Sequence, residues 1–448
     1  MNRSWLKAGS LLAALGLLVT ACGTEAASDA DGAAAEEASG AGGADGGDGN
    51  VGDAVGEIVL GAPTALGTVE GRASVDAAQL AVDEINEAGG VEIGGEIYTV
   101  RLVEADTRGA EPDIPVPDAL AAIEGMIDSA APHGFVVSPF RSEVMLAAMD
   151  LIADEQIPTI ASIATTPEFQ ARIVEDPARF KYFFRNSVNG QHLGMYLTGV
   201  LRFLQEEHGY DSIMLIHQDV LWARGATEGV GGWAQENGWT VIGNAAVPTG
   251  QSDFASALAS ARDAGADVIM PMFDMPQSGA LVPQARGMGI DALIVGFNSP
   301  MAAENATASF DAEELEGVLN LIFEIGPLAV GSVPASVRFN EAFGEAYGEE
   351  ARAGLPGHGP GPSYDAVYIM IDAMQRAGSL DGEAVADALA ETDYEGVVGR
   401  ITFGEDGQAP YGMDPSEAAL GALFQWQDGQ RVPVYPEGIA EAALVVPN

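Results

Sequence analysis

Thiols and cationic side chains are scarce in this 448-residue chain, and each scarcity excludes a class of chemistry. Cys22 is the single cysteine, so the chain can form neither an internal disulfide nor a zinc site built on cysteines. Lys7 and Lys181 are the only lysines, and the formal net charge is -47. Such a surface repels phosphate backbones, which argues against nucleic acid as a partner. The acidic residues are spread along the whole chain, which favours solubility in a salty medium over capture of cationic solutes.

Known catalytic motifs are also absent. The sequence has no Gly-x-Ser-x-Gly elbow, no Walker loop and no His-Glu-x-x-His helix, and its five histidines lack metal-ligand spacing. The glycine-rich segment 357–361 lacks the strand-to-helix context of a dinucleotide loop and is interpreted as a turn. The sequence therefore disfavours an enzyme and predicts neither metal nor cofactor. A pair of carboxylates in a cleft would still suit a hydrolase.

The N-terminal residues have the features of a secreted lipoprotein. An apolar segment over 8–19 follows two basic residues and is too short to span a bilayer comfortably. Small residues then run up to Cys22, and the segment 19–22 resembles a bacterial lipobox. This resemblance implies a signal peptide over 1–21, acylation of Cys22, and an extracytoplasmic protein that is lipid-anchored to the bacterial cell membrane. An ordinary secretory leader and an N-terminal membrane anchor are the alternatives.

The mature chain begins with a spacer and continues with alternating strands and helices. Residues 22–54 are mostly small or acidic and include no aromatic residue, which predicts a disordered acidic tether after the cysteine. Hydrophobic periodicity then predicts alternating strands and helices over 57–160 and again over 193–295. Such alternation builds parallel sheets with helices on both faces. The predicted fold is α/β, with two doubly wound parallel-sheet lobes.

Two loops of the first series carry hydroxyl groups. A loop leads from the predicted strand 135–137 to Ser142, and the loop after strand 158–160 contains Thr165 and Thr166. Ligands of open α/β sheets lie beyond the carboxyl ends of the strands, where helix N–H groups also point. These loops therefore predict a carboxylate-binding corner. Alternatively, Ser142 and Thr166 merely cap the helices that follow.

Several segments, in this order and spacing, carry a family resemblance. They are 77–86 with the glycines at 89 and 90, 164–168, 252–254, 363–368, 399–403 and 424–429. Over residues 57 to about 436 the chain resembles the branched-chain amino-acid-binding (Leu/Ile/Val-type) family of type I periplasmic binding proteins. The resemblance implies two lobes joined by three crossovers, a ligand in the cleft between them, and delivery to the permease and ATPase subunits of an ABC transporter.

The same resemblance implies a division of the chain. The first lobe would comprise 55–187 and 318–395, and the second lobe 188–317 and 396–448.

The family's ligand contacts map onto five residues. Ser142 and Thr165 match the hydroxyls that hold the carboxylate of an amino acid, with the Ile163 backbone between them. Trp222 falls at an aromatic wall position and Asp274 at a second-lobe contact. These residues imply that the carboxylate grip of the family is retained.

Other positions depart from the family pattern or lie at the edge of the expected cleft. Tyr364 falls near the hinge-side wall of the cleft. Asn298 replaces the acid that pairs with the ligand ammonium, and Glu70 occupies an aromatic position, so Asp274 and Glu70 are candidate substitutes for that acid. Arg141 enters a loop that is usually small or apolar. It would either receive a second acidic group of the ligand or neutralise Glu70 or the neighbouring acid at 143.

The function implied is that of a solute-binding lipoprotein of an ABC importer, for an amino acid or a related small carboxylate or amide. A ligand-sensing module that acts through a membrane partner is the main alternative, and a cleft hydrolase is less favoured.

Overall fold

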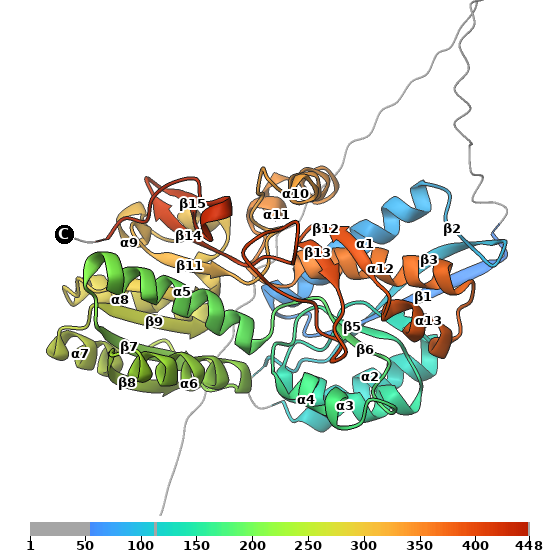
Figure 1. Ribbon diagram of the computed structural model, residues 1–448, viewed down its shortest axis with the longest axis horizontal. Helices are drawn as coiled ribbons and strands as arrows, with labels where there is room; N and C mark the ends of the chain where they lie inside the picture. Colours follow the sequence, from blue (N-terminus) through green and yellow to red (C-terminus); the bar gives the residue numbers. More distant parts are fainter. Residues whose placement is uncertain (1–53, 112–113, 447–448) are drawn as a thin grey trace, which may run out of the picture. The chain divides into compact units, whose positions relative to one another are not determined.

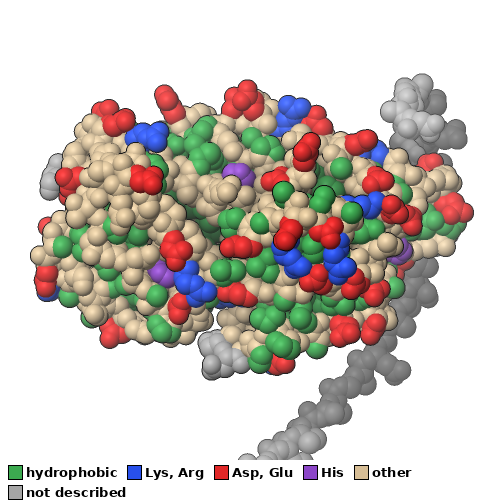
Figure 2. All heavy atoms as spheres, turned by 60° about the horizontal axis from the view of Figure 1, so that its bottom comes forward, with side chains coloured by type: hydrophobic (Ala, Val, Ile, Leu, Met, Phe, Trp, Pro, Cys, Tyr) green, Lys and Arg blue, Asp and Glu red, His purple; other side chains and the backbone are tan. Residues whose placement is uncertain are grey.

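The computed structural model describes residues 54–111 and 114–446, whose helices and strands are drawn in Figure 1. The expected signal peptide, Cys22 and the tether up to residue 53 lie outside these ranges. Within them, no helix is long and apolar enough to cross a membrane. Figure 2 shows acidic side chains scattered over the visible face, with fewer Lys and Arg among them.

The first sheet has six strands and is parallel except at one edge. In spatial order its strands are β2 (Val91–Ile93), β3 (Glu96–Asp106), β1 (Gly56–Thr64), β4 (Gly134–Phe135), β5 (Thr159–Ala161) and β6 (Phe183–Arg185). Its helices are α1 (Val69–Glu87), α2 (Val116–Ala130), α3 (Ser142–Asp154), α4 (Glu168–Glu175), α12 (Pro360–Ala377) and α13 (Gly382–Leu389). Figure 1 shows α1 and α12 on one face of this sheet and α2 and α3 on the other.

The second sheet has seven strands, of which β14 alone runs antiparallel to the others and pairs antiparallel with both β11 and β15. In spatial order they are β15 (Gln430–Tyr435), β14 (Ala422–Gln427), β11 (Leu319–Ile322), β10 (Leu293–Asn298), β9 (Val268–Phe273), β7 (Ser212–Gln218) and β8 (Thr240–Val247). Its helices are α5 (Gly190–His208), α6 (Leu221–Glu236), α7 (Ala255–Ala264), α8 (Leu281–Gly287) and α9 (Ala312–Leu315). Helices α6 and α7 pack on β7 and β8. The predicted α/β fold with two parallel-dominated sheets is confirmed.

The chain passes between the two sheets after β6, after β11 and before β14. The remaining elements are α10 (Pro334–Tyr347), α11 (Glu349–Ala353), the hairpin of β12 (Asp393–Gly396) and β13 (Gly399–Thr402), and the 3-10 helices η2 (Pro276–Ala280), η3 (Ser299–Met301), η4 (Glu304–Ala308) and η5 (Glu437–Ile439). The expected boundary at residue 318 differs from the strand pairing. Because β11 pairs with β10 and β14, the chain leaves the second sheet only after Ile322.

Local sequence explains where these elements begin and why they are buried. Helix α1 begins at Val69, because the Thr68 hydroxyl accepts the Gly71 N–H at 3.0 Å and so caps the helix. Helix α5 begins after Asn189, which forms a reciprocal capping box with His192. Strands β9 and β10 are buried along their whole length, as expected of continuous apolar strands in the interior of a parallel sheet.

Candidate functional site

A small cavity lies where the carboxyl ends of strands from both sheets meet. It is lined by Glu70, Phe140, Ser142, Ile163, Thr165, Trp222, Asp274, Phe297, Phe323 and His358. Its volume is about 10 Å³, roughly the room that one water molecule needs. Ser142 follows β4, Thr165 follows β5 and Asp274 directly follows β9. Ligands of α/β sheets bind at this edge, so we call this space the inner cavity and take it as the candidate site.

Ser142 and Thr165 both line the inner cavity with their hydroxyl groups uncommitted. Helix α3 begins at Ser142 itself after Arg141 at the N-cap, so the alternative that Ser142 caps this helix is wrong. Helix α4 begins at Glu168 with Pro167 at the N-cap, one residue later than expected. Among the described residues, neither the Ser142 nor the Thr165 hydroxyl is engaged in a hydrogen bond. Together with the N–H groups of the first turn of α3, these hydroxyls can bind a carboxylate.

The Ile163 backbone is held in place by neighbouring side chains. Its N–H donates to the Ser138 hydroxyl at 3.2 Å. Contrary to expectation, this N–H group is therefore not free to bind a ligand. The Ile163 carbonyl accepts a hydrogen bond from His358 Nε2 at 2.8 Å, and His358 Nδ1 faces the Glu324 carboxylate at 3.0 Å. Both partners of the imidazole are acceptors, which requires the protonated ring. Burial opposes this charge, but Glu324, Glu70 and the Ile163 carbonyl together outweigh it and raise the pKa of His358. The segment 357–361 thus supports the site, beyond the turn that was expected.

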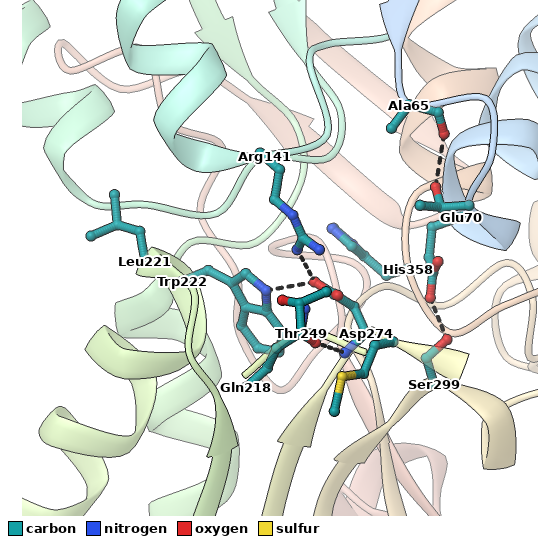
Figure 3. Close-up of polar contacts among 12 residues, drawn as sticks. Ala65, Glu70, Arg141, Gln218, Leu221, Trp222, Thr249, Asp274, Ser299 and His358 are labelled. Atoms are coloured by element: carbon teal, nitrogen blue, oxygen red, sulfur yellow. Dashed lines mark hydrogen bonds and ion pairs between the residues drawn. The ribbon is translucent and has the colours of Figure 1, made fainter. Parts of the chain in front are cut away.

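Glu70 brings a carboxyl group with an open acceptor to the cavity. The side chain is fully buried in the first turn of α1, and one oxygen accepts a hydrogen bond from the Ser299 hydroxyl (Figure 3). The other oxygen, Oε2, is buried without a partner in the described part of the chain. Burial raises the pKa of Glu70 from 4.5 to about 7. A ligand N–H group placed here would satisfy the acceptor and favour the ionised carboxylate.

Arg141 and Asp274 form a buried ion pair that joins α3 to the end of β9. Figure 3 shows the guanidinium pointing to Asp274, with 2.5 Å between Arg141 Nη1 and Asp274 Oδ2. The same oxygen accepts the Trp222 Nε1–H at 2.7 Å. The Asp274 N–H donates to Gln218 Oε1 at 3.2 Å, and Gln218 in turn donates to the Thr249 hydroxyl at 3.0 Å. The Oδ2 atom and the N–H of Asp274 are therefore committed within the protein.

This pairing differs from one of the alternatives that the sequence offered for Arg141, and its contact with a second acidic group of a ligand stays a prediction. Arg141 contacts neither Glu70 nor Glu143, because its partner is Asp274. Glu143 instead accepts the Leu221 N–H at 2.9 Å, at the start of α6. Because Arg141 and Trp222 both bond one oxygen of Asp274, Glu70 is the acid whose unpartnered oxygen is fully buried in the described part of the chain.

Aromatic side chains form one wall of the inner cavity. The Trp222 ring packs edge-on against Phe297 and Phe323, with centroids 6.1 and 5.8 Å apart. Phe297 and Phe323 lie 4.4 Å apart, and Phe323 also contacts the His358 ring at 4.6 Å. Such a wall suits the apolar part of a ligand, and its negative ring faces also favour a nearby cation.

Asn298 and Tyr364 lie outside the cavity lining, contrary to expectation. The Asn298 side-chain amide forms hydrogen bonds of 2.7 and 3.2 Å with Ser278. The Asn298 backbone N–H and carbonyl are hydrogen-bonded to the Asn320 side chain. Tyr364 packs between α12 and α1, where its hydroxyl donates to Glu84 at 2.5 Å. Both residues are structural, because their polar groups are satisfied within one lobe.

The sequence did not single out several residues that form the site. Phe140 and Phe297 each directly precede a residue that the resemblance did identify, so strand-end position was the available signal. His358 lay within the glycine-rich segment that was read as a turn. Phe323 follows the short strand β11, which was not predicted, and Ser299 acts only through its contact with Glu70. Neither has a sequence signal of its own.

Known proteins are similar to this chain in sequence and in fold. The family model described as periplasmic binding protein matches residues 59–426. A Leu/Ile/Val-binding protein homolog 7 of Brucella abortus is 23% identical over 375 residues, covering 83% of this chain and 88% of that protein. The leucine-, isoleucine-, valine-, threonine-, and alanine-binding protein of Pseudomonas aeruginosa is 26% identical over 331 residues, covering 74% and 80%.

Solved structures agree on the fold. A putative branched-chain amino acid ABC transporter protein from Silicibacter pomeroyi has a TM-score of 0.71 at 21% identity, covering 87% of this chain and 99% of that one. The substrate binding protein LivJ from Streptococcus pneumoniae, solved in complex with isoleucine, has a TM-score of 0.66 at 21% identity, covering 88% and 100%.

The family match and the relatives identify a solute-binding protein of α/β fold rather than an enzyme, in agreement with the prediction. More specifically, the chain belongs to the periplasmic binding protein family, and the family resemblance seen in the sequence is confirmed.

Proposed function

We propose that this protein is the extracytoplasmic solute-binding lipoprotein of an ABC importer and that it captures an amino acid or a related small carboxylate or amide. The carboxylate would bind the Ser142 and Thr165 hydroxyls and the first turn of α3. The ammonium or amide N–H would bind Glu70, and the aromatic wall around Trp222 would cover the apolar part.

The observation that carries this proposal is the pair of uncommitted groups in one cavity. The Glu70 Oε2 atom is buried without a partner among the described residues, and the Ser142 and Thr165 hydroxyls are not engaged in hydrogen bonds there. Buried polar groups are normally satisfied, so an unmatched acceptor beside unmatched donors indicates a ligand that supplies both. A zwitterionic amino acid supplies both.

Contacts across the cleft support capture by closure of two lobes, one built on each sheet. Arg141 reaches Asp274, Glu143 accepts the Leu221 N–H, and Glu70 accepts the Ser299 hydroxyl. In each contact a residue attached to the first sheet meets one attached to the second. A ligand that touches both sides would favour the closed arrangement by its differential affinity.

The anchor and the partners are inferred from the sequence and from relatives. Cys22 would carry the lipid that holds the mature protein on the cell membrane. The relatives are named as amino-acid-binding proteins, and one solved structure carries isoleucine. The permease and ATPase subunits of an ABC transporter would receive the ligand.

A thermal-shift screen of the purified protein against amino acids, amides and small dicarboxylates tests this proposal. A ligand raises the unfolding temperature by mass action, and a matched screen of the Ser142→Ala/Thr165→Val variant should lose the shift for every carboxylate. Equal shifts in both proteins would refute the proposed carboxylate site.

A further inference from the structure

A larger cavity lies directly outside the inner cavity, and one ion pair stands between them. This outer cavity has a volume of about 210 Å³. Glu70 and Asp274 line both cavities, whereas Arg141 lines only the outer one. The Arg141–Asp274 pair therefore stands at the border where the two spaces meet. Figure 3 shows it bridging the gap between the two parts of the chain.

The pair is braced from the side of the second sheet. Asp274 Oδ2 accepts from both Arg141 and Trp222, and the Asp274 N–H is held by Gln218, which donates to Thr249. Removing one member would leave the other charge buried and unpaired, which is strongly unfavourable. A ligand that pushes the two side chains apart meets the same penalty unless it pairs with both.

The sizes of the two cavities indicate how this ion pair would constrain the length of the ligand. The inner cavity is about 10 Å³, so a bound molecule must already enlarge it. A side chain that extends from it on the side of Glu70 and Asp274 must pass the ion pair to reach the outer cavity, whereas a separate cavity of about 480 Å³ adjoins Thr165 and Trp222 on the other side. The walls of the outer cavity include Ala65, Val69, Ala110, Met275 and Pro276, which would accept an apolar chain. The apolar walls would therefore tolerate a long side chain, and the ion pair in front of them limits the length of the ligand.

We propose that the Arg141–Asp274 pair is a partition that sets ligand length, and that the preferred ligands carry short side chains. This inference rests on the proposed binding of amino acids. It assigns to Arg141 and Asp274 a role in specificity rather than in holding the charged groups of the ligand, which fall to Ser142, Thr165 and Glu70.

Calorimetry on a homologous series tests the partition. The series is glycine, alanine, 2-aminobutyrate, norvaline and norleucine, which adds one methylene group at each step. In the wild-type protein, affinity should fall by roughly tenfold or more once the side chain outgrows the inner cavity. The double variant Arg141→Ala/Asp274→Ala removes both charges together. In this variant, the loss of affinity should begin only with side chains that are longer by two or more methylene groups. Each added methylene should then strengthen binding by roughly threefold to fourfold as it enters the outer cavity.

An exposed pair offers a matched control. Arg400 and Asp393 are joined by two 2.8 Å contacts on the β12–β13 hairpin, and their replacement by alanine should leave the length limit unchanged. If the alanine pair at the partition fails to fold, Arg141→Ser/Asp274→Ser removes the same charges while keeping short polar groups that water can solvate.

The possible outcomes are distinct. An unchanged length limit in a folded double variant would overturn the partition. Loss of the whole series in a folded double variant would also overturn it, because the pair would then contact the ligand directly. Failure of the wild-type protein to bind any member would instead refute the proposed amino-acid function, on which the partition rests.

Discussion

Replacing Glu70 by glutamine should change the pH dependence of stability in a defined direction. The pKa of Glu70 is raised by burial to about 7 in the folded protein, compared with 4.5 for an unperturbed side chain. The folded state therefore holds this proton more tightly than the unfolded chain does. As a result, the free energy of unfolding of the wild type should decrease as pH rises from about 4.5 to about 7, and this contribution should be level above that range.

The difference between about 7 and 4.5, at about 1.36 kcal/mol per pKa unit, corresponds to about 3 kcal/mol. Glu70→Gln cannot ionise, so its stability relative to the wild type should increase by about 3 kcal/mol between pH 4.5 and pH 7. Urea denaturation of the ligand-free proteins at a series of pH values measures this change. Burial also raises the pKa of Asp365 to about 7. Asp365 titrates in both proteins, so its contribution to stability cancels in the comparison.

Ligand binding provides the counterpart of this experiment. If the ligand ammonium pairs with ionised Glu70, wild-type affinity should strengthen about tenfold per pH unit up to about pH 7, and Glu70→Gln should lose this dependence. Glu124→Gln, on the exposed face of α2, is the matched control and should behave like the wild type. A difference in the free energy of unfolding between Glu70→Gln and the wild type that stays constant over this pH range would refute the reasoning.

Three further predictions follow from the site and the sequence. Ser142→Ala and Thr165→Val should each weaken binding of a carboxylate ligand by roughly tenfold or more in calorimetry, because each hydrogen bond to a charged group contributes about 1.5–3 kcal/mol; the exposed control Ser260→Ala should leave the affinity unchanged. His358→Ala should lower the free energy of unfolding by about 3 kcal/mol, because it leaves the buried Glu324 without its cation, and an unchanged denaturation midpoint would contradict this ion pair. Cys22→Ala should abolish acylation, so the variant should move from the detergent phase to the aqueous phase in a partitioning assay of expressed full-length protein; equal partitioning would contradict lipidation.

The fold was accessible from the sequence because its signals are local and repeated. Alternating periodicity identified most strands and helices, including the buried β9 and β10. The signals failed where an element is short or is completed from a distance. Strand β11 was missed because its four residues give no periodicity, and its pairing with β14, about a hundred residues later, places it in the second sheet.

The candidate site was partly accessible for a similar reason. Ser142 and Thr165 lie in the loops that follow β4 and β5, so strand-end position and family resemblance both pointed to them. The partner of Arg141 could not be found this way, because Asp274 is 133 residues away and several nearer acids were equally plausible. Asn298 and Tyr364 were misplaced because their hydrogen-bond partners, which take up their polar groups, are visible only in the folded chain.

A crystal structure of the protein with bound alanine tests the central claim most directly. The account predicts one alanine in the inner cavity, with its carboxylate within hydrogen-bonding distance of the Ser142 and Thr165 hydroxyls and its ammonium at Glu70 Oε2. An alanine bound elsewhere, or one held in this cavity by the Arg141 guanidinium while Ser142 and Thr165 make no contact with it, would contradict the account.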